Sequence, residues 1–273
     1  MPERGDAARP GSEPASRVIT WHHRLVARWW ANFNTDGPEI DHFRADVEAA
    51  QPGLDVGCGS GRLLVPWVAA GLDVDGVDPA ADMIAACREA ARAVGREPLL
   101  AVQAAHELDL PRRYGAAVLC GSFGLGVTRA EDLEGLRRVR AHLRPGGVLA
   151  LDYEVNELRP DQWRSCGPGQ RTRRRRNPPN GASARTASYA IRHRITELDA
   201  DESRMHRELA VWQWRGDELV ANESHALVVN VYSREQIVAA LGEAGFGEIR
   251  VTGGYHGGEP TEHDRLLVYR AVA

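Results

Sequence analysis

The sequence predicts an α/β protein built around a parallel sheet, with an antiparallel β segment added to it. Between residues 52 and 152, short apolar runs alternate with helical patterns across short loops, which is typical of βαβ units. The first apolar run leads directly into a turn that contains three glycines. Residues 187–231 are rich in aromatic and β-branched side chains and alternate in polarity, as in an antiparallel meander.

The N-terminal part of the chain precedes this pattern. Residues 1–17 are rich in proline, glycine, serine and charge, so we expect a disordered tail. Residues 18–50 carry apolar and aromatic side chains at helical spacing, and Gly37-Pro38 separates two predicted helical pieces.

The alternating region ends each helical pattern at a glycine or at Pro145-Gly146, which marks the element boundaries. We expect strands at 54–56, 72–77, 98–102, 115–120 and 148–152, with helices at 62–70, 81–94 and 131–143.

The rhythm changes after Tyr153, and residues 156–231 read as an insertion. A mobile loop at 165–183 is expected to precede three strands. Ser233 and Gln236 have capping-box spacing and predict the start of a helix that Gly245 ends. The predicted strands are 187–198, 204–214 and 218–231 in the insertion, then 249–252 and 266–271 at the end of the chain.

Composition restricts the function classes. The chain has 273 residues, 43% of them hydrophobic, and a formal net charge of -4, so no global bias toward nucleic acid or an anionic membrane is present. No apolar run is long enough to span a bilayer, and no signal peptide is evident, so we expect a cytoplasmic protein without membrane contact. The four cysteines form no CxxC pair and the histidines no HExxH motif, so no metal is expected.

The glycine turn "LDVGCGSGRLL" has a strand before it and a helix after it, an arrangement that binds anionic or polar cofactors. Its glycines are Gly57, Gly59 and Gly61, whereas a dinucleotide fingerprint requires a glycine where Arg62 stands. Asp78 ends the second strand about 20 residues later, where a carboxylate can accept both hydroxyls of a ribose. The alternative for Asp78 is a helix cap, and both roles can coexist.

Together these segments resemble the class I S-adenosylmethionine (SAM)-dependent methyltransferases of the small-molecule type. The resemblance covers about residues 50–153 and 230–273. It implies a Rossmann-like seven-stranded sheet of order 3-2-1-4-5-7-6 with strand 7 antiparallel, formed by residues 51–155 and 232–273. The similar segments are "LDVGCGSGRLL", "VDGVDPAADMI", "AHLRPGGVLALD" and "YSREQIVAALGEAGFGEIRV".

The resemblance also implies SAM as cofactor and S-adenosylhomocysteine (SAH) as product. The three glycines would line the methionine part, Asp55 would anchor its ammonium group, and Asp78 would hold the ribose. Where the family often has an aspartate for the adenine, this chain has His106. The remaining expected cofactor contacts are Cys58, Pro79, Met83, Ala105, Glu107 and Cys120.

Methyl transfer is an in-line displacement, so the protein mainly aligns the reactants and excludes water, and a base helps when the acceptor must lose a proton. Asp152, Tyr153 and Glu154 follow the fifth strand and are candidates for that base, as is His256 in a glycine-rich segment. The alternative for the first three is a solvated strand end.

The acceptor site has weaker signals. An N-terminal helical lid would bring Trp21, His22 and Trp30 to the acceptor, and Phe123 would form a wall after strand four. The alternative is that these aromatic residues are ordinary core.

The leading prediction is therefore methyl transfer to O or N of a small-molecule acceptor. A nucleic-acid or protein methyltransferase is the alternative enzyme, and a non-catalytic SAM-binding protein is the alternative outside enzymes. The run "RTRRRR" at 171–176 could contact phosphates, but a solvated loop is favoured and nucleic acid is not the expected partner. The insertion could cover the acceptor or build a homodimer contact.

Overall fold

The computed structural model describes residues 20–154, 164–165, 172–173 and 187–273. The predicted tail at 1–17 lies outside the described residues. So does most of the predicted mobile loop, including four of the six residues of the arginine run.

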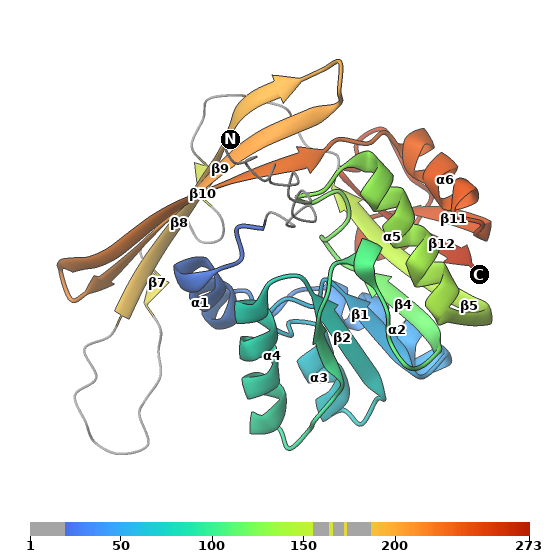
Figure 1. Ribbon diagram of the computed structural model, residues 1–273, viewed down its shortest axis with the longest axis horizontal. Coiled ribbons are helices and arrows are strands. Elements are labelled where there is room, and N and C mark those ends of the chain that lie inside the picture. The colour runs from blue at the N-terminus through green and yellow to red at the C-terminus, as the bar shows by residue number, and fades with distance from the viewer. Residues whose placement is uncertain (1–19, 155–163, 166–171, 174–186) are drawn as a thin grey trace, which may run out of the picture.

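The central sheet has seven strands in the order β11-β12-β5-β4-β1-β2-β3 (Figure 1). Strand β12 runs antiparallel to both β5 and β11, whereas the strands from β5 to β3 are parallel. This confirms the predicted order, with β12 as the seventh strand and β11 as the sixth. The strands are β1 (Gly53–Val56), β2 (Val74–Asp78), β3 (Leu100–Val102), β4 (Tyr114–Leu119), β5 (Leu143–Glu154), β11 (Gly247–Gly253) and β12 (Leu266–Val272).

Helices cover both faces of this sheet because its central strands are apolar on both sides. In β4, Ala116 and Val118 face one layer, whereas Ala117 and Leu119 face the other. The first layer contains α2 (Glu39–Ala49), α3 (Leu64–Ala69) and α4 (Ala81–Ala93), and the second contains α5 (Arg129–His142) and α6 (Arg234–Glu243).

Capping boxes begin the two helices of the second layer. The Ser233 side chain accepts from Gln236 N at the start of α6, as predicted. Thr128 and Glu131 form the same motif at α5, which therefore starts two residues before the predicted helix. This cap places Asp132 in the first turn of α5.

The insertion forms a second, antiparallel sheet that extends from the central domain as a long twisted ribbon (Figure 1). Its main strands agree with the predicted meander, and Gly216, at a φ of 63°, makes the predicted hairpin turn. The strands are β8 (Ala187–Asp199), β9 (Arg204–Arg215) and β10 (Glu218–Asn230), and the short β6 (Arg164–Ser165) and β7 (Thr172–Arg173) pair with β8.

Helix α1 (Arg24–Phe33) lies between the insertion sheet and α4 (Figure 1). Its start is tied to both neighbours, since Arg24 N donates to Asp82 in α4 at 2.7 Å and Leu25 N donates to Glu223 in β10 at 3.2 Å. The two N-terminal helices thus separate, with α1 against the insertion and α2 against the central sheet. The apolar core that α1 shares with the insertion includes Trp21, Leu25, Val26, Trp29, Ile191, Leu209 and Val211.

Candidate functional site

A cavity of about 350 Å³ lies at the carboxyl ends of β1, β2 and β4 and extends beneath α1 and the insertion. Its size and position are those of a small-ligand site in an open α/β sheet. Of the predicted site residues, it is lined by Trp21, His22, Trp30, Asp55, Gly57, Cys58, Gly59, Asp78, Pro79, Met83, Ala105, His106, Cys120 and Phe123. Gly61, Glu107, Asp152, Tyr153, Glu154 and His256 do not line it.

The glycine turn forms one wall, and its glycines have different roles. All three have positive φ, 79° at Gly57, 54° at Gly59 and 91° at Gly61, which side chains rarely adopt. A Cβ at Gly57 would lie 2.4 Å from the Cβ of Ser122, so this glycine permits close packing. A Cβ at Gly59 would meet nothing within 4 Å, so Gly59 presents bare backbone to open space beside the cavity.

Asp78 links the glycine turn to the next strand. One carboxylate oxygen accepts from Gly59 N at 3.0 Å, and the other accepts from Ala80 N at 2.8 Å. Burial raises the pKa of Asp78 to about 6, although these hydrogen bonds oppose the shift. Asp78 does not cap α4, because the N-cap is Ala80 and no side chain caps this helix. Each Asp78 oxygen keeps acceptor capacity for a ligand hydroxyl, which leaves room for the predicted contact with a ribose.

Asp55 carries the clearest requirement for a ligand. It is 2% exposed, and its Oδ2 has no hydrogen-bond partner within the described part of the chain. Burial, and then the neighbouring charge of Asp78, raise the pKa of Asp55 to about 7. An unpaired buried carboxylate oxygen is costly, and a cationic donor such as an ammonium group would satisfy it. The site therefore fits the methionine end of SAM.

The predicted adenine side is the short helix η1 (Ala105–Glu107), which packs against α5. A Cβ at Gly135 would lie 3.1 Å from the Cβ of Ala105, so the glycine lets η1 approach closely. His106 Nε2 lies 3.8 Å from Glu131 Oε1. His106 thus lines the cavity at the predicted adenine position, while Glu107 does not.

Residues 54–147 match the family described as the methyltransferase domain. This part of the chain is therefore a methyltransferase domain. Among curated proteins, an uncharacterized methyltransferase of Mycobacterium tuberculosis (strain ATCC 25618 / H37Rv) is 33% identical over 119 residues. That match covers 44% of this chain and 46% of the relative, so it spans about half of each protein.

Solved methyltransferase structures share the fold over most of the chain. A SAM-dependent methyltransferase from Clostridium acetobutylicum ATCC 824 has a TM-score of 0.68 at 14% identity, covering 90% of this chain and 91% of the other. The sugar N-methyltransferase KedS8 from Streptoalloteichus sp ATCC 53650 has 0.67 at 19% identity, covering 98% and 99%. The amino pentose methyltransferase CalS10 from Micromonospora echinaspora has 0.64 at 19%, covering 93% and 98%. The last two spans include the insertion as well as the methyltransferase domain.

His22 lies at the end of the cavity that α1 covers, opposite the methyltransferase domain. Its Nε2 accepts from Trp21 Nε1 at 3.1 Å, which leaves the proton on Nδ1, 2.9 Å from Thr20 Oγ1. Burial, with a smaller effect of His23, lowers the pKa of His22 to about 4. His22 is thus a neutral wall residue whose single basic nitrogen is already engaged.

Asp152 was predicted as a candidate base, but the structure gives it other partners. Its carboxylate accepts from Gly121 N and from Tyr255 OH, both at 2.5 Å, and from Cys120 Sγ at 3.1 Å. These contacts fix the turn after β4, so Asp152 positions the residues that follow that strand.

The other three predicted bases also lie away from the cavity lining. Tyr153 OH donates to Asn230 O at 3.1 Å and accepts from Tyr232 N at 3.0 Å, which joins β5 to the end of the insertion. Glu154 is exposed, and exposed His256 lies 3.3 Å from Asp264. Tyr153 and Glu154 lie at the end of β5, as predicted, and His256 lies in the short helix η2 (Gly254–His256). A position at the end of a strand does not by itself show which side chains turn toward the cavity.

Several further residues line the cavity but were not predicted from the sequence, among them Asp132, Arg207 and Leu227. Asp132 had a signal, since the spacing Thr128-x-x-Glu131 is that of a capping box and puts the next residue in a first turn after strand four. Arg207 and Leu227 come from the insertion, where strand pattern alone does not reveal which face meets another domain.

In the described ranges, no three histidine, cysteine or acidic side chains are grouped so that they could hold a metal ion. Nor is any described helix long and apolar enough to cross a membrane.

Proposed function

We propose that this protein transfers the methyl group of SAM to a nitrogen atom of a small, amine-bearing molecule. The observation that carries the proposal is one continuous cavity, with the glycine turn and Asp78 at one end and Trp21, Trp30 and Phe123 at the other. The names of KedS8 and CalS10, a sugar N-methyltransferase and an amino pentose methyltransferase, support nitrogen in a small acceptor.

The residues of the cofactor end have defined tasks in this proposal. Asp55 pairs with the ammonium group of the cofactor, Asp78 accepts from the ribose hydroxyls, and Gly59 allows close backbone contact. When bound, SAM supplies a methyl group already activated by a sulfonium. The protein therefore needs no metal to activate it, and its main task is to hold the reactants in line.

The acceptor end excludes water and limits the size of the acceptor. Trp21 and Trp30 from the α1 region, Phe123 after β4 and Leu227 from β10 give it apolar walls. Because α1 and the insertion cover this end, a nucleic acid or a folded protein would have to displace them. A small molecule would not have to displace them, which favours a small-molecule acceptor over a nucleic acid or a protein.

Binding of the cofactor is the first test. We expect calorimetry to show micromolar binding of SAM and SAH to the wild type and none of NAD. We expect Asp78→Ala to lose both adenosyl ligands while remaining folded by circular dichroism. If neither ligand binds the wild type, the proposal is wrong.

Acceptor class is the second test. The wild type and SAM would be incubated with amino sugars and other small amines, matched hydroxyl analogues, RNA and a protein mixture, and methylation followed by mass spectrometry. We expect methylated amines. Methylation confined to the hydroxyl analogues, to RNA or to protein would contradict the proposed acceptor.

A further inference from the structure

Asp132 is a buried carboxylate on the cavity wall that the predicted mechanism does not use. It lies in the first turn of α5, is 7% exposed, and lines the cavity. A carboxylate in the first turn of a helix is favoured by the helix dipole. Burial nevertheless makes a charged group costly, so a buried carboxylate on a cavity wall invites a functional explanation.

Asn230 at the end of the insertion and Tyr232 just after it hold this carboxylate. Asn230 Nδ2 and Tyr232 OH both donate to Asp132 Oδ2, each at 2.7 Å. Asn230 Nδ2 also donates to Val127 O at 2.8 Å, which fixes the orientation of the amide. The orientation of the Asp132 carboxylate is therefore set by two donors to its Oδ2, as expected for a preorganised group.

Asp132 lies nearer the start of α5 than the part of this helix that packs against the predicted adenine side. Gly135 packs against η1, whereas Asp132 lies one turn earlier and contacts the end of β10. The loop just before α5 supplies Phe123 and Leu125 to the same cavity, and Leu125 pairs with Val229 of β10. Asp132 therefore belongs to the acceptor end.

We propose that Asp132 is a catalytic residue that accepts a hydrogen bond from the acceptor nitrogen and then takes its proton. This inference rests on the proposed function. The nitrogen lone pair forms the N–C bond while the S–C bond breaks and its electron pair stays on sulfur, so the positive charge passes to nitrogen. The carboxylate stabilises that charge, the N–H proton moves to it, and the proton later leaves to water.

The surroundings of Asp132 suit this role. The titratable groups around it are Arg129 and Glu131 on α5, Tyr153 on β5, and Tyr232. Burial raises the pKa of Asp132 to about 6, while the hydrogen bonds from Tyr232, Asn230 and the backbone of Gly124, and the charge of Arg129, limit the rise. The group is then mostly ionised at neutral pH and basic enough to receive a proton. His22 also lines the cavity, but its basic nitrogen is engaged by Trp21.

A binding experiment tests this without a known acceptor. Sinefungin carries an amine-bearing carbon where SAM carries the methylated sulfur, so its extra ammonium reports negative charge beside the transferred methyl. Calorimetry would give the affinities of sinefungin and SAH for the wild type, Asp132→Asn and Asp75→Asn at pH values from about 5.5 to 8. Asp75→Asn is the matched control, because Asp75 is also a buried aspartate that accepts from a tyrosine but lies outside the cavity.

We expect Asp132→Asn to lower the ratio of sinefungin to SAH affinity about tenfold at pH 8 and to leave SAH affinity unchanged. Asp75→Asn should leave the ratio unchanged. In the wild type, the ratio of sinefungin to SAH affinity should also fall when the pH is lowered through about 6. In Asp132→Asn, the ratio should not depend on pH. Asp55 and Asp78 contact parts that both ligands share, so their titration cancels in the ratio.

The outcomes separate the two proposals. If SAH binds but the ratio neither changes in Asp132→Asn nor depends on pH in the wild type, the role of Asp132 is wrong. If SAH does not bind the wild type, the proposed function fails instead. The pH dependence of the wild type tests the inference even if Asp132→Asn does not fold.

Discussion

The two ends of strand β2 each carry a buried aspartate, but the two carboxylates have different kinds of partner. Asp75 near the start of the strand is 3% exposed, and Asp78 at its end is 6% exposed. Asp75 pairs with the cationic side chain of Arg112 and accepts from Tyr114 OH, whereas Asp78 accepts from backbone N–H groups and lines the cavity.

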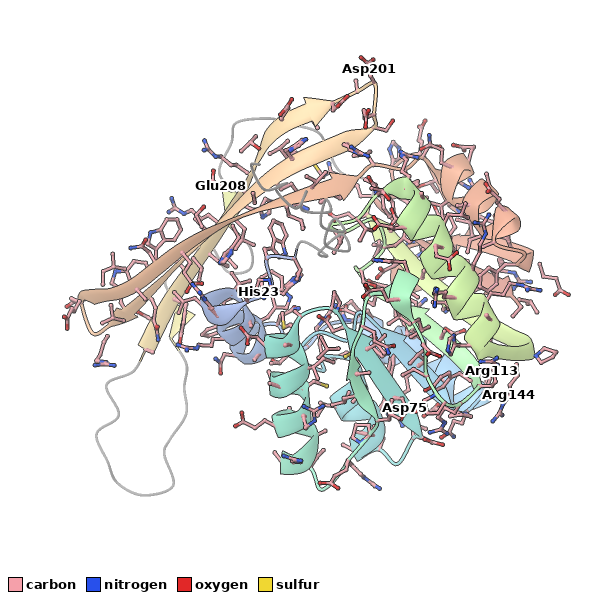
Figure 2. All side chains as sticks on the ribbon, in the orientation of Figure 1. His23, Asp75, Arg113, Arg144, Asp201 and Glu208 are labelled. Carbon is pink, nitrogen blue, oxygen red and sulfur yellow. The ribbon has the colours of Figure 1, made fainter. Side chains whose placement is uncertain are left out.

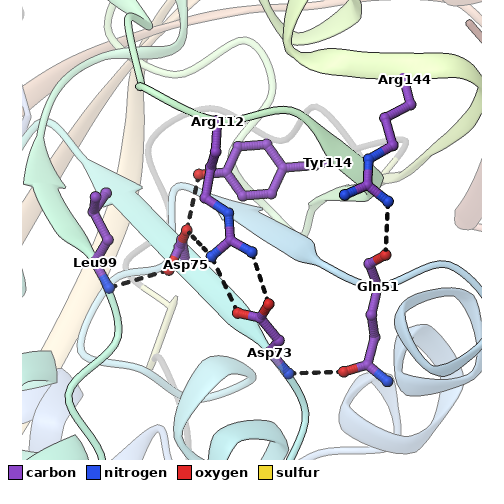
Figure 3. Close-up of polar contacts among 7 residues, drawn as sticks. All are labelled: Gln51, Asp73, Asp75, Leu99, Arg112, Tyr114 and Arg144. Atoms are coloured by element: carbon purple, nitrogen blue, oxygen red, sulfur yellow. Dashed lines mark hydrogen bonds and ion pairs between the residues drawn. The ribbon is translucent and has the colours of Figure 1, made fainter.

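At the Asp75 end, a compact polar network closes the sheet (Figure 3). Asp75 accepts from Tyr114 OH at 3.0 Å, from Arg112 at 3.1 Å and from Leu99 N at 3.1 Å. Arg112 also pairs with Asp73 at 2.7 Å. Figure 2 shows Asp75 far from the insertion, which carries Asp201 and Glu208.

At the Asp78 end, no arginine in the described part of the chain forms an ion pair with the carboxylate, and burial raises the pKa of Asp78 to about 6. A buried charge without a cationic partner is unfavourable for the free protein, and a ligand that donates hydrogen bonds to it reduces that cost. Under the proposed function, a buried aspartate that is paired with an arginine stabilises the fold, whereas a buried aspartate without a cationic partner binds the ligand.

The largest effect should come from Asp78→Asn, which we expect to weaken SAH binding about 100-fold, or 2.7 kcal/mol. The stability of the free protein should change little, because the relief of a buried charge is offset by the loss of one of the two backbone hydrogen bonds that the carboxylate accepts. Calorimetry and urea unfolding would measure the two quantities. Unchanged SAH affinity would remove Asp78 from the binding site.

Asp75→Asn should do the reverse. We expect the free energy of unfolding to fall by about 2 kcal/mol, because a buried hydrogen-bonded ion pair loses one partner while Arg112 keeps Asp73 and solvent. SAH affinity should stay within about twofold of the wild type. If urea unfolding instead shows no loss of stability, the network in Figure 3 does not stabilise the fold.

Acidification should weaken SAH binding about tenfold between about pH 7.5 and 5.5. The raised pKa values of Asp55 and Asp78, about 7 and about 6, mean that the free folded protein binds more protons than the unfolded chain between about pH 4 and 7. These groups therefore favour folding less as pH rises, whereas the ligand needs them ionised. Calorimetry across this range measures how SAH affinity changes with pH, and this change should be smaller in Asp78→Asn than in the wild type. An equal slope in that variant would contradict this origin.

The smallest effect is expected from alanine substitutions at two glycines that both have positive φ. Gly59 and Gly71 both have positive φ and open space at a Cβ position, so alanine at either should cost about 1 kcal/mol of stability. Only Gly59 lines the cavity, so only Gly59→Ala should weaken SAH binding. Thermal unfolding and calorimetry measure both properties. Equal SAH affinity in the two variants would place Gly59 outside the cofactor contact.

Much of the cofactor end could be predicted because its signals are local. The positions of Gly57, Gly59 and Asp78 follow from a strand, a tight turn and the end of the next strand, all within a single βαβ unit. The acceptor end could be predicted only in part. Trp21 and Phe123 were expected there, but the candidate bases Asp152 and His256 turn toward other partners.

The sequence by itself determined the alternation of strands and helices, the glycine turn and the buried aspartate that follows it, because periodicity and turn chemistry act over a few residues. The tertiary structure alone decided which side chains meet across the cavity. Asp132 and Asn230 are 98 residues apart and touch only because β10 returns to the loop before α5. Likewise α1 covers the acceptor end only because its apolar face is buried against the insertion sheet. Contacts of this range depend on how whole elements pack, which no local pattern encodes.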